Sequence, residues 1–124
     1  FKKVNDTFGH IAGDAAILHV VHRIRAALSD GAQFGRFGGE EFVIYLVQES
    51  NESKKDSAFE QLAERVRRAV EENPLNFDGQ VIPLTVSAGV TTHRTGEEPG
   101  ETLNRADQAL YQAKESGRNQ VQTL

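Results

Sequence analysis

Two adjacent glycines followed at once by two acidic residues are the part of this sequence best suited to chemistry. Gly38 and Gly39 allow a tight turn and close approach by a ligand, because glycine adopts positive φ angles without steric cost. Glu40 and Glu41 add two carboxylates, whose oxygens suit Mg²⁺, a cation that usually keeps water and substrate phosphates as its other ligands. A glycine turn with solvated acids is the more common meaning of such a string, so the surrounding sequence has to decide between the two.

The segments on either side of these residues predict a β-hairpin with the acids at its tip. Residues 34–37 are Phe-Gly-Arg-Phe, and residues 42–46 are Phe-Val-Ile-Tyr-Leu. Short extended segments separated by a few turn residues are typical of a hairpin. Such a hairpin would hold both carboxylates at one turn.

Helices are expected where apolar residues recur with helical spacing. The first follows Asp14 and carries a stripe with i, i+3, i+4, i+7 spacing: Ile17, Val20, Val21, Ile24 and Leu28. The second has a similar stripe and ends before Asn73: Phe59, Leu62, Ala63, Val66 and Val70. The third covers about residues 101–115, and Gly117 caps its C-terminus.

Further strands are expected in the second half of the chain. Asp78 and Gly79 are a hairpin turn signal that leads into a strand over residues 81–90. One face of this strand is apolar: Ile82, Leu84, Val86, Ala88 and Val90. Pro83 indicates that its first part lies at an edge or a bulge, and residues 119–123 are expected to form a last short strand. Helices that alternate irregularly with hairpins indicate an α+β fold, with an antiparallel sheet and helices packed against it.

The composition limits what the chain can bind. Its 124 residues suffice for one domain, and its net charge of −4 offers no general surface for polyanions. This charge argues against nucleic acid as a partner and against direct contact with a membrane surface. Cysteine is absent, which excludes disulfides and thiolate metal sites. No stretch is long enough to span a bilayer and no signal peptide is visible, so we expect a cytoplasmic domain.

Four segments, in order along nearly the whole chain, resemble the motifs of the GGDEF family, the diguanylate cyclases. They are FKKVNDTFGHIAGD at residues 1–14, GGEEF at 38–42, LTVSAGV at 84–90 and RADQALYQAKESGRN at 105–119. The second segment is the family's signature in its common GGEEF form. The resemblance implies a fold like that of nucleotide cyclases and polymerase palms, which have a ferredoxin-like core with an antiparallel central sheet flanked by helices.

The resemblance also implies an activity. Two GTP molecules would be condensed into cyclic di-GMP and two pyrophosphates at the interface of two domains, each holding one GTP. The expected partners are therefore GTP, a second copy of the domain, and a sensory or regulatory domain fused in the parent protein. An alternative is a catalytically inactive domain that binds GTP or other proteins and regulates a neighbour. A related cyclase or polymerase palm that uses one nucleotide is a weaker alternative.

The family's metal and guanine positions can be carried over residue by residue. Glu40 is expected to bind Mg²⁺, with Mn²⁺ as an alternative, and to take the proton of a ribose 3′-hydroxyl, while Glu41 would bind the same metal. A carboxylate is a weak base, so the metal role carries more weight. Asn5 and Asp14 match the positions that bind guanine, whose edge offers two N–H donors beside a carbonyl. From the residues alone, Asn5 suits a turn and Asp14 suits a helix cap.

The remaining carried-over positions would contact the sugar and the phosphates. His10 is expected near the sugar, although a structural histidine is the alternative. Lys2, Lys114 and Arg118 match phosphate-binding positions. Lys114 also suits the last turn of a helix, where a cation complements the helix dipole. Tyr111 is expected in the core rather than at a ligand.

Two departures from the family pattern are expected to matter. Family members carry a further metal-binding Asp on a strand just before the Phe-Lys pair, whereas this chain opens at Phe1 and contains no methionine. We therefore expect a fragment that lacks its first central strand, from a parent that can be anchored in a membrane by another segment. Secondly, Ser29 and Ala32 occupy the positions of an inhibitory RxxD motif, so no inhibitory product site is expected.

Overall fold

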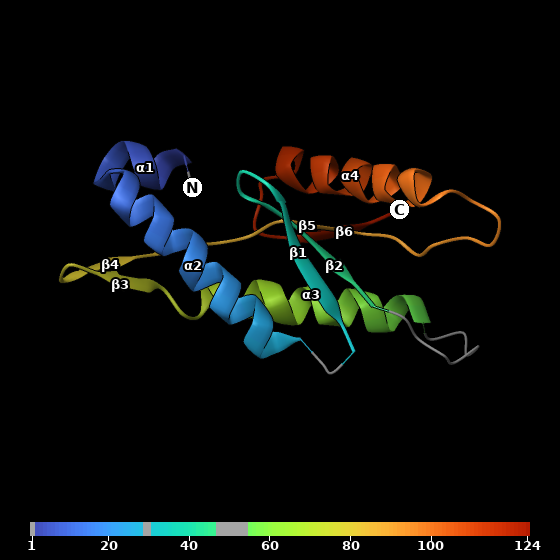
Figure 1. Ribbon diagram of the computed structural model, residues 1–124, viewed down its shortest axis with the longest axis horizontal. Helices are drawn as coiled ribbons and strands as arrows, with labels where there is room; N and C mark the ends of the chain where they lie inside the picture. Colours follow the sequence, from blue (N-terminus) through green and yellow to red (C-terminus); the bar gives the residue numbers. More distant parts are fainter. Residues whose placement is uncertain (1, 29–30, 47–54) are drawn as a thin grey trace.

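The computed structural model describes residues 2–28, 31–46 and 55–124, and the side chains of these residues apart from 2, 3 and 55–57. Helices and strands alternate along the chain (Figure 1). The helices are α1 (Lys2–Phe8), α2 (His10–Ala27), α3 (Lys55–Glu71) and α4 (Pro99–Glu115). The strands are β1 (Gln33–Gly38), β2 (Glu41–Tyr45), β3 (Leu75–Phe77), β4 (Gln80–Ile82), β5 (Ala88–Val90) and β6 (Val121–Thr123).

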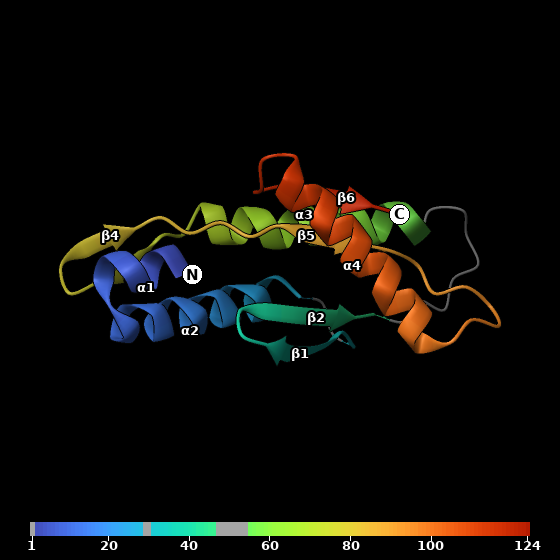
Figure 2. The same ribbon diagram turned by 90° about the horizontal axis from the view of Figure 1, so that it is seen from above.

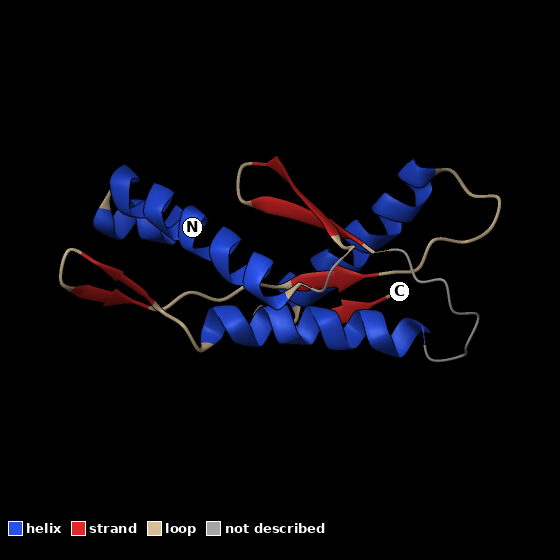
Figure 3. Ribbon diagram, turned by 60° about the horizontal axis from the view of Figure 1, so that its bottom comes forward, coloured by secondary structure: helices blue, strands red, loops and turns tan. Residues whose placement is uncertain are grey.

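The strands of the described residues pair in three two-stranded sheets (Figure 3). Strands β1 and β2 are antiparallel, as are β3 and β4, whereas β5 and β6 are parallel. The mixture of helices and antiparallel strands confirms the expected α+β fold. The parallel pair was not expected, and it follows from the connection, because α4 lies between β5 and β6 and parallel strands need a crossover of this kind.

The core lies mainly between α2, α3 and the chain that follows α3. Its buried side chains come from both helices and from residues 75–84: Val20, Ile24, Val66, Val70, Leu75, Ile82 and Leu84. Phe34, Phe42 and Ile44 of the first hairpin pack against this cluster. Helix α4 contacts β5 and β6, and Figure 1 shows α3 and α4 on opposite sides of this pair. The layers thus cover one face of the β1–β2 hairpin and both faces of the β5–β6 pair.

The N-terminal residues fold differently from the expectation. They form a helix of their own, α1, which ends at Phe8, and α2 begins at His10 rather than after Asp14. Gly9 has φ 92°, a left-handed conformation that breaks the helical path between α1 and α2. Asn5 therefore lies in a helix and not in a turn. Asp14 lies beyond the first turn of α2, whose N-terminus has no side-chain cap, so the capping role considered for it is wrong.

The long strand expected over residues 81–90 is interrupted. It consists of β4, an irregular segment over residues 83–87, and β5. Pro83 follows directly after β4 and has no N–H to donate, so pairing ends there. The turn signal at Asp78 and Gly79 is confirmed, because both residues have positive φ angles, 50° and 78°. In the part of the chain that the structure describes, no helix has the length and apolar character needed to cross a membrane.

Candidate functional site

The acidic turn stands at the tip of the β1–β2 hairpin, as expected. Gly38 pairs with Glu41, and Gly39 and Glu40 form the turn between them, with Gly39 at φ 50°. A register shift between Arg36 and Gly38 marks a β-bulge just before the turn. Nε of Arg36 donates a hydrogen bond to the carbonyl oxygen of Gly39 at 2.6 Å, which braces the turn. The hairpin thus projects both glutamates to its exposed end.

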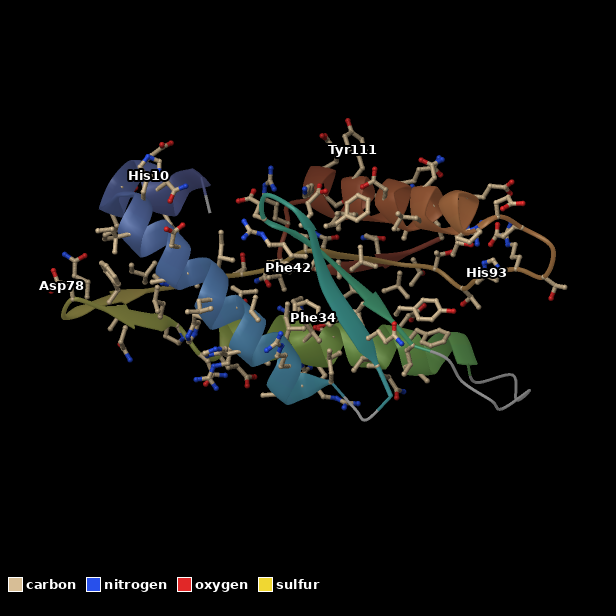
Figure 4. The ribbon with its side chains drawn as sticks, viewed as in Figure 1. His10, Phe34, Phe42, Asp78, His93 and Tyr111 are labelled. Carbon is tan, nitrogen blue, oxygen red and sulfur yellow. The ribbon has the colours of Figure 1, made fainter. Side chains whose placement is uncertain are left out.

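The turn is open around its glycines and anchored at its base. A Cβ atom placed on Gly38 or Gly39 would meet no heavy atom within 4 Å. Farther from the turn, the rings of Phe34 and Phe42 stack with centroids 5.5 Å apart and hold the hairpin on the core (Figure 4). Backbone conformation and packing therefore fix the hairpin while leaving space for a ligand beside its tip.

Two carboxylates in this setting fit a hydrated divalent cation. Among residues 2–28, 31–46 and 55–124, no group of three or more His, Asp or Glu side chains converges as a metal cage. Mg²⁺ is commonly held by one or two carboxylates together with phosphate oxygens and water. Glu40 and Glu41 are exposed and can supply those carboxylates. The donor set fits a cation that arrives with a phosphate-bearing ligand.

A second group of expected site residues meets at the corner between α1 and α2. Asn5 is half-buried on α1, and its carboxamide lies against Gly13 of α2. His10 and Asp14 are exposed and four residues apart on α2, so they lie on one side of that helix. Figure 4 shows His10 at this corner. The structure thus places Asn5 against Gly13, and His10 and Asp14 on an exposed side of the same end of α2.

The basic residues of the expected site lie at the C-terminal end of α4. Lys114 is half-buried in the last turn, which suits both a phosphate contact and the helix dipole. Gly117 has φ 113°, and the N–H of Arg118 donates to the carbonyl oxygen of Ala113 at 2.9 Å, a helix cap of the Schellman type. Among the described residues no ion pair involves Lys114 or Arg118. The side chain of Lys2, on α1, lies outside the described residues.

The three groups lie around the start of α1 but apart from one another. In Figure 1 the β1–β2 turn lies between the α1–α2 corner and the C-terminal end of α4, and in Figure 2 the turn and the end of α4 lie on opposite sides of the start of α1. The three groups offer different chemistry: an amide and a carboxylate at the α1–α2 corner, a pair of carboxylates at the turn, and cations at the end of α4. Together they could bind a ligand that has a base, a sugar and phosphates.

Three further residues named from the sequence can be placed or excluded. Ala32 is half-buried, and Ser29 lies outside the described residues. Tyr111 is 64% exposed, so its expected place in the core is wrong.

Sequence reasoning missed a polar network at the N-terminal end of α4. Nη1 and Nη2 of Arg105 donate to the two carboxylate oxygens of Glu97 at 2.8 and 2.7 Å. Arg105 also donates to the hydroxyl of Thr91 and the carbonyl oxygen of Thr92, each at 2.7 Å. The hydrogen bonds from Arg105, followed by that from the Arg94 N–H, hold the pKa of Glu97 well below its ordinary value. This network fastens the loop after β5 onto α4, and the position of Arg105 in the fourth motif was its only sequence signal.

A second missed residue, Asn119, fastens the turn after α4. Its side chain accepts a hydrogen bond from Nη1 of Arg67 at 2.9 Å and donates to Glu71, both on α3. Its backbone N–H donates to Oγ of Ser87 at 3.1 Å. The hydrogen bond from Asn119 is the main cause of a lowered pKa for Glu71, followed by that from Arg67. Arg118 therefore lies between the helix cap and Asn119. We call the side-chain hydrogen bonds of Asn119 to α3 the Asn119 clamp.

Comparison with known proteins identifies the family. The model of the family described as "Diguanylate cyclase, GGDEF domain" matches residues 1–120. The chain is 42% identical over 123 residues to diguanylate cyclase DgcP of Pseudomonas aeruginosa, a match that covers 98% of this chain and 17% of that protein. It is 35% identical over 123 residues to cyclic di-GMP phosphodiesterase NbdA of the same species, with 98% of this chain and 15% of that protein covered.

A solved structure supports the same assignment at the level of the fold. The crystal structure of diguanylate cyclase SiaD in complex with its activator SiaC, from Pseudomonas aeruginosa, matches with a TM-score of 0.89 and 37% identity. The match covers 99% of this chain and 45% of that chain. The chain thus spans well under two thirds of the length of these relatives. From the family match, the sequence identity and the shared fold, it follows that the chain belongs to the GGDEF family.

Proposed function

We propose that residues 1–124 form a single GGDEF domain that condenses two GTP molecules into cyclic di-GMP and two pyrophosphates. The observation that carries the proposal is the open Gly-Gly turn presenting Glu40 and Glu41, which in Figure 1 lies between an amide–carboxylate corner and a cationic helix end. A domain that consumes GTP works where GTP is made, so the proposal includes a cytoplasmic location.

Guanine would be bound at the α1–α2 corner. The Asp14 carboxylate accepts hydrogen bonds from the N–H donors of the guanine edge, and the Asn5 carboxamide can serve a donor or the carbonyl. His10, at the start of α2, would contact the sugar. Adenine presents a different pattern of donors and acceptors, and it would leave these polar groups unpaired. The corner would thus select the base.

The triphosphate would be held by Lys2, Lys114 and Arg118. Arg118 offers a planar guanidinium that binds phosphate through two hydrogen bonds, and Lys114 adds a mobile point charge. Arg118 has φ 64° and is exposed, so its side chain leaves the capped turn toward solvent. The helix cap and the Asn119 clamp fix the backbone from which it starts.

Glu40 and Glu41 would hold Mg²⁺, for which Mn²⁺ is an alternative because both accept carboxylate and phosphate oxygens. When bound, the cation would offset negative charge at the α-phosphate and the attacking oxygen. A carboxylate oxygen of Glu40 accepts the proton of the 3′-hydroxyl. This hydroxyl belongs to the nucleotide of one domain and attacks the α-phosphate in the other. Positioning of this kind supplies up to about 7–11 kcal/mol of a barrier, so the second copy is part of the reaction.

A regulatory role without catalysis is the second candidate. It is favoured by the match to NbdA, a protein named for cyclic di-GMP phosphodiesterase activity. That match covers 98% of this chain and 15% of NbdA. In such a role the domain would bind GTP or a partner protein and control a fused neighbour. The same corner and the same basic residues would serve nucleotide binding in that case.

Product analysis separates the two candidates. The intact protein is incubated with GTP and Mg²⁺ at several protein concentrations, and the products are resolved by chromatography. Cyclic di-GMP that rises more steeply than protein concentration and vanishes in Glu40→Ala supports the cyclase. GTP binding that Asp14→Ala abolishes, without any product, supports the regulatory role.

A further inference from the structure

The backbone conformation at Gly13 does not require a glycine. It is buried in the second turn of α2, on the side that meets α1, and its φ is not among the positive ones. Within a helix, glycine costs about 1 kcal/mol relative to alanine. The neighbours of Gly13 supply a packing reason for a glycine at this position.

The packing reason is the side chain of Asn5. A Cβ atom built on Gly13 would lie 1.5 Å from Oδ1, 2.6 Å from Cγ and 3.3 Å from Nδ2 of Asn5. The nearest heavy atoms thus all belong to one carboxamide, which occupies the space that any side chain at residue 13 would need. A Cβ atom built in the same way on Gly100, in the first turn of α4, would meet no heavy atom within 4 Å.

We infer that Gly13 is a positioning residue for base recognition: by lacking a side chain it seats the Asn5 carboxamide beside Asp14. The inference rests on the proposed function, in which Asn5 and Asp14 bind guanine. Gly13 directly precedes Asp14, so a carboxamide that lies on Gly13 is next to the residue that carries the carboxylate. Gly13 itself would touch no part of the nucleotide.

Packing rather than hydrogen bonding holds the Asn5 side chain. Within the described residues no hydrogen bond to its carboxamide is found, and the residue is only half-buried. Its polar atoms are therefore available to a base, while the surface of Gly13 limits where they can lie. A carboxamide placed before the ligand arrives loses less conformational entropy on binding.

Alanine at residue 13 should displace Asn5 and leave the helix intact. The atoms that would be overlapped belong to the end of a flexible side chain, which can turn to another rotamer, and not to the backbone. Alanine is also the better helix former. The main consequence of Gly13→Ala is thus a carboxamide moved away from Asp14.

The test measures base discrimination. Binding of 3′-deoxy-GTP and 3′-deoxy-ITP is titrated by calorimetry on the intact protein, because nucleotides without a 3′-hydroxyl cannot react, and because inosine lacks only the 2-amino group of guanine. For Gly13→Ala we expect affinity for 3′-deoxy-GTP to fall about tenfold, the loss of one hydrogen bond, and affinity for 3′-deoxy-ITP to fall less, because the carboxamide oxygen of Asn5 would accept from the 2-amino group that inosine lacks. Gly100→Ala is the matched control, a helical glycine in open space, and should bind both as the wild type does.

A double-mutant cycle shows whether the effect passes through Asn5. If it does, adding Gly13→Ala to Asn5→Ala costs no further affinity, and the two changes are strongly non-additive. Asn5→Gln provides a second approach that leaves α2 untouched: it keeps the amide but lengthens the side chain, so it should reproduce the loss seen in Gly13→Ala.

Four results would overturn the inference. They are wild-type discrimination in Gly13→Ala, an equal loss for both nucleotides, full additivity with Asn5→Ala, and normal discrimination in Asn5→Gln. Failure of the proposed function looks different, because the wild-type protein itself would then show no preference for 3′-deoxy-GTP over 3′-deoxy-ITP.

Discussion

The β1–β2 turn and helix α4 supply opposite ends of the candidate site, and they are held in different ways. The turn rests on its cross-strand pairing, on the Arg36–Gly39 hydrogen bond and on the stacked rings at the base of the hairpin. Its glycines have open space around them. Helix α4 is fastened at both ends, by Arg105 and Glu97 at one and by Asn119, Arg67 and Glu71 at the other.

The difference indicates that the two parts of the site have different roles. On the side of the site with basic residues, bonds within the domain hold the backbone from which Lys114 and Arg118 start, so this backbone would need no further ordering when phosphates bind. The acidic turn is held by its backbone pairing and has open space beside its glycines, as a cation and a second nucleotide would require. We therefore expect changes in the turn to affect chemistry, and changes around α4 to affect stability and the binding of phosphates.

The largest effect is expected from Glu40→Gln. If Glu40 binds the metal and accepts the proton, turnover should fall at least about a hundredfold. The melting temperature should stay within experimental error, because Glu40 is exposed. Initial rates of cyclic di-GMP formation and a thermal melt measure the two quantities. Glu60→Gln, an exposed glutamate on α3, is the control, and equal rates in both variants would remove Glu40 from the chemistry.

The clamp at Asn119 should matter next. Asn119 has φ 50°, so Asn119→Ala introduces backbone strain and removes the bonds to α3, and the free energy of unfolding should fall by about 1–3 kcal/mol. Asn119→Gly accepts the same φ, so it should recover the part of the loss due to strain. Both should raise KM for GTP more than they lower kcat, because Arg118 would be placed less well.

Denaturant titrations and steady-state kinetics of the two variants distinguish these contributions. An alanine variant as stable as the glycine variant would show that the left-handed backbone contributes nothing. An unchanged KM in both would show that the clamp supports the fold only.

The other end of α4 provides a smaller test. Arg105→Lys keeps the charge but loses the paired hydrogen bonds to Glu97, and the contacts to Thr91 and Thr92 would be left incomplete. The melting temperature should fall while the KM for GTP changes little, since none of the expected phosphate contacts lies at this end. A large rise in KM would mean that the two ends of α4 are coupled.

The smallest effect is expected from acidification. The pKa of Glu97 is lowered from its ordinary 4.5, so the unfolded state binds more protons than the folded state in the range below about pH 4.5. The stability due to ionised Glu97 is fully present above that pH and is lost as the pH falls. The wild type should therefore lose stability more steeply than Glu97→Gln between about pH 5 and about pH 3. Glu115→Gln, exposed at the end of α4, should follow the wild type.

Much of the fold follows from local rules that the sequence displays. The paired positive φ angles at Asp78 and Gly79, the glycine cap at Gly117 and the hairpin around Gly39 depend on residues within a few positions of each other. The same holds for the stripes of α2 and α3, whose members Val20, Ile24, Val66 and Val70 are buried. Helix α1 was not expected, because its seven residues carry only one apolar pair with helical spacing, Val4 and Phe8.

The sequence by itself determined the family pattern, the acidic turn, the order of most elements and the chemistry available at each site position. Tertiary structure alone decided that Asn5 lies on Gly13, that Asn119 bridges to α3, that Arg105 binds Glu97, and that β5 pairs in parallel with β6. These features depend on contacts between residues from 8 to more than 50 positions apart. Propensity and periodicity describe only the near neighbours of a residue, whereas such contacts are set by how whole elements pack.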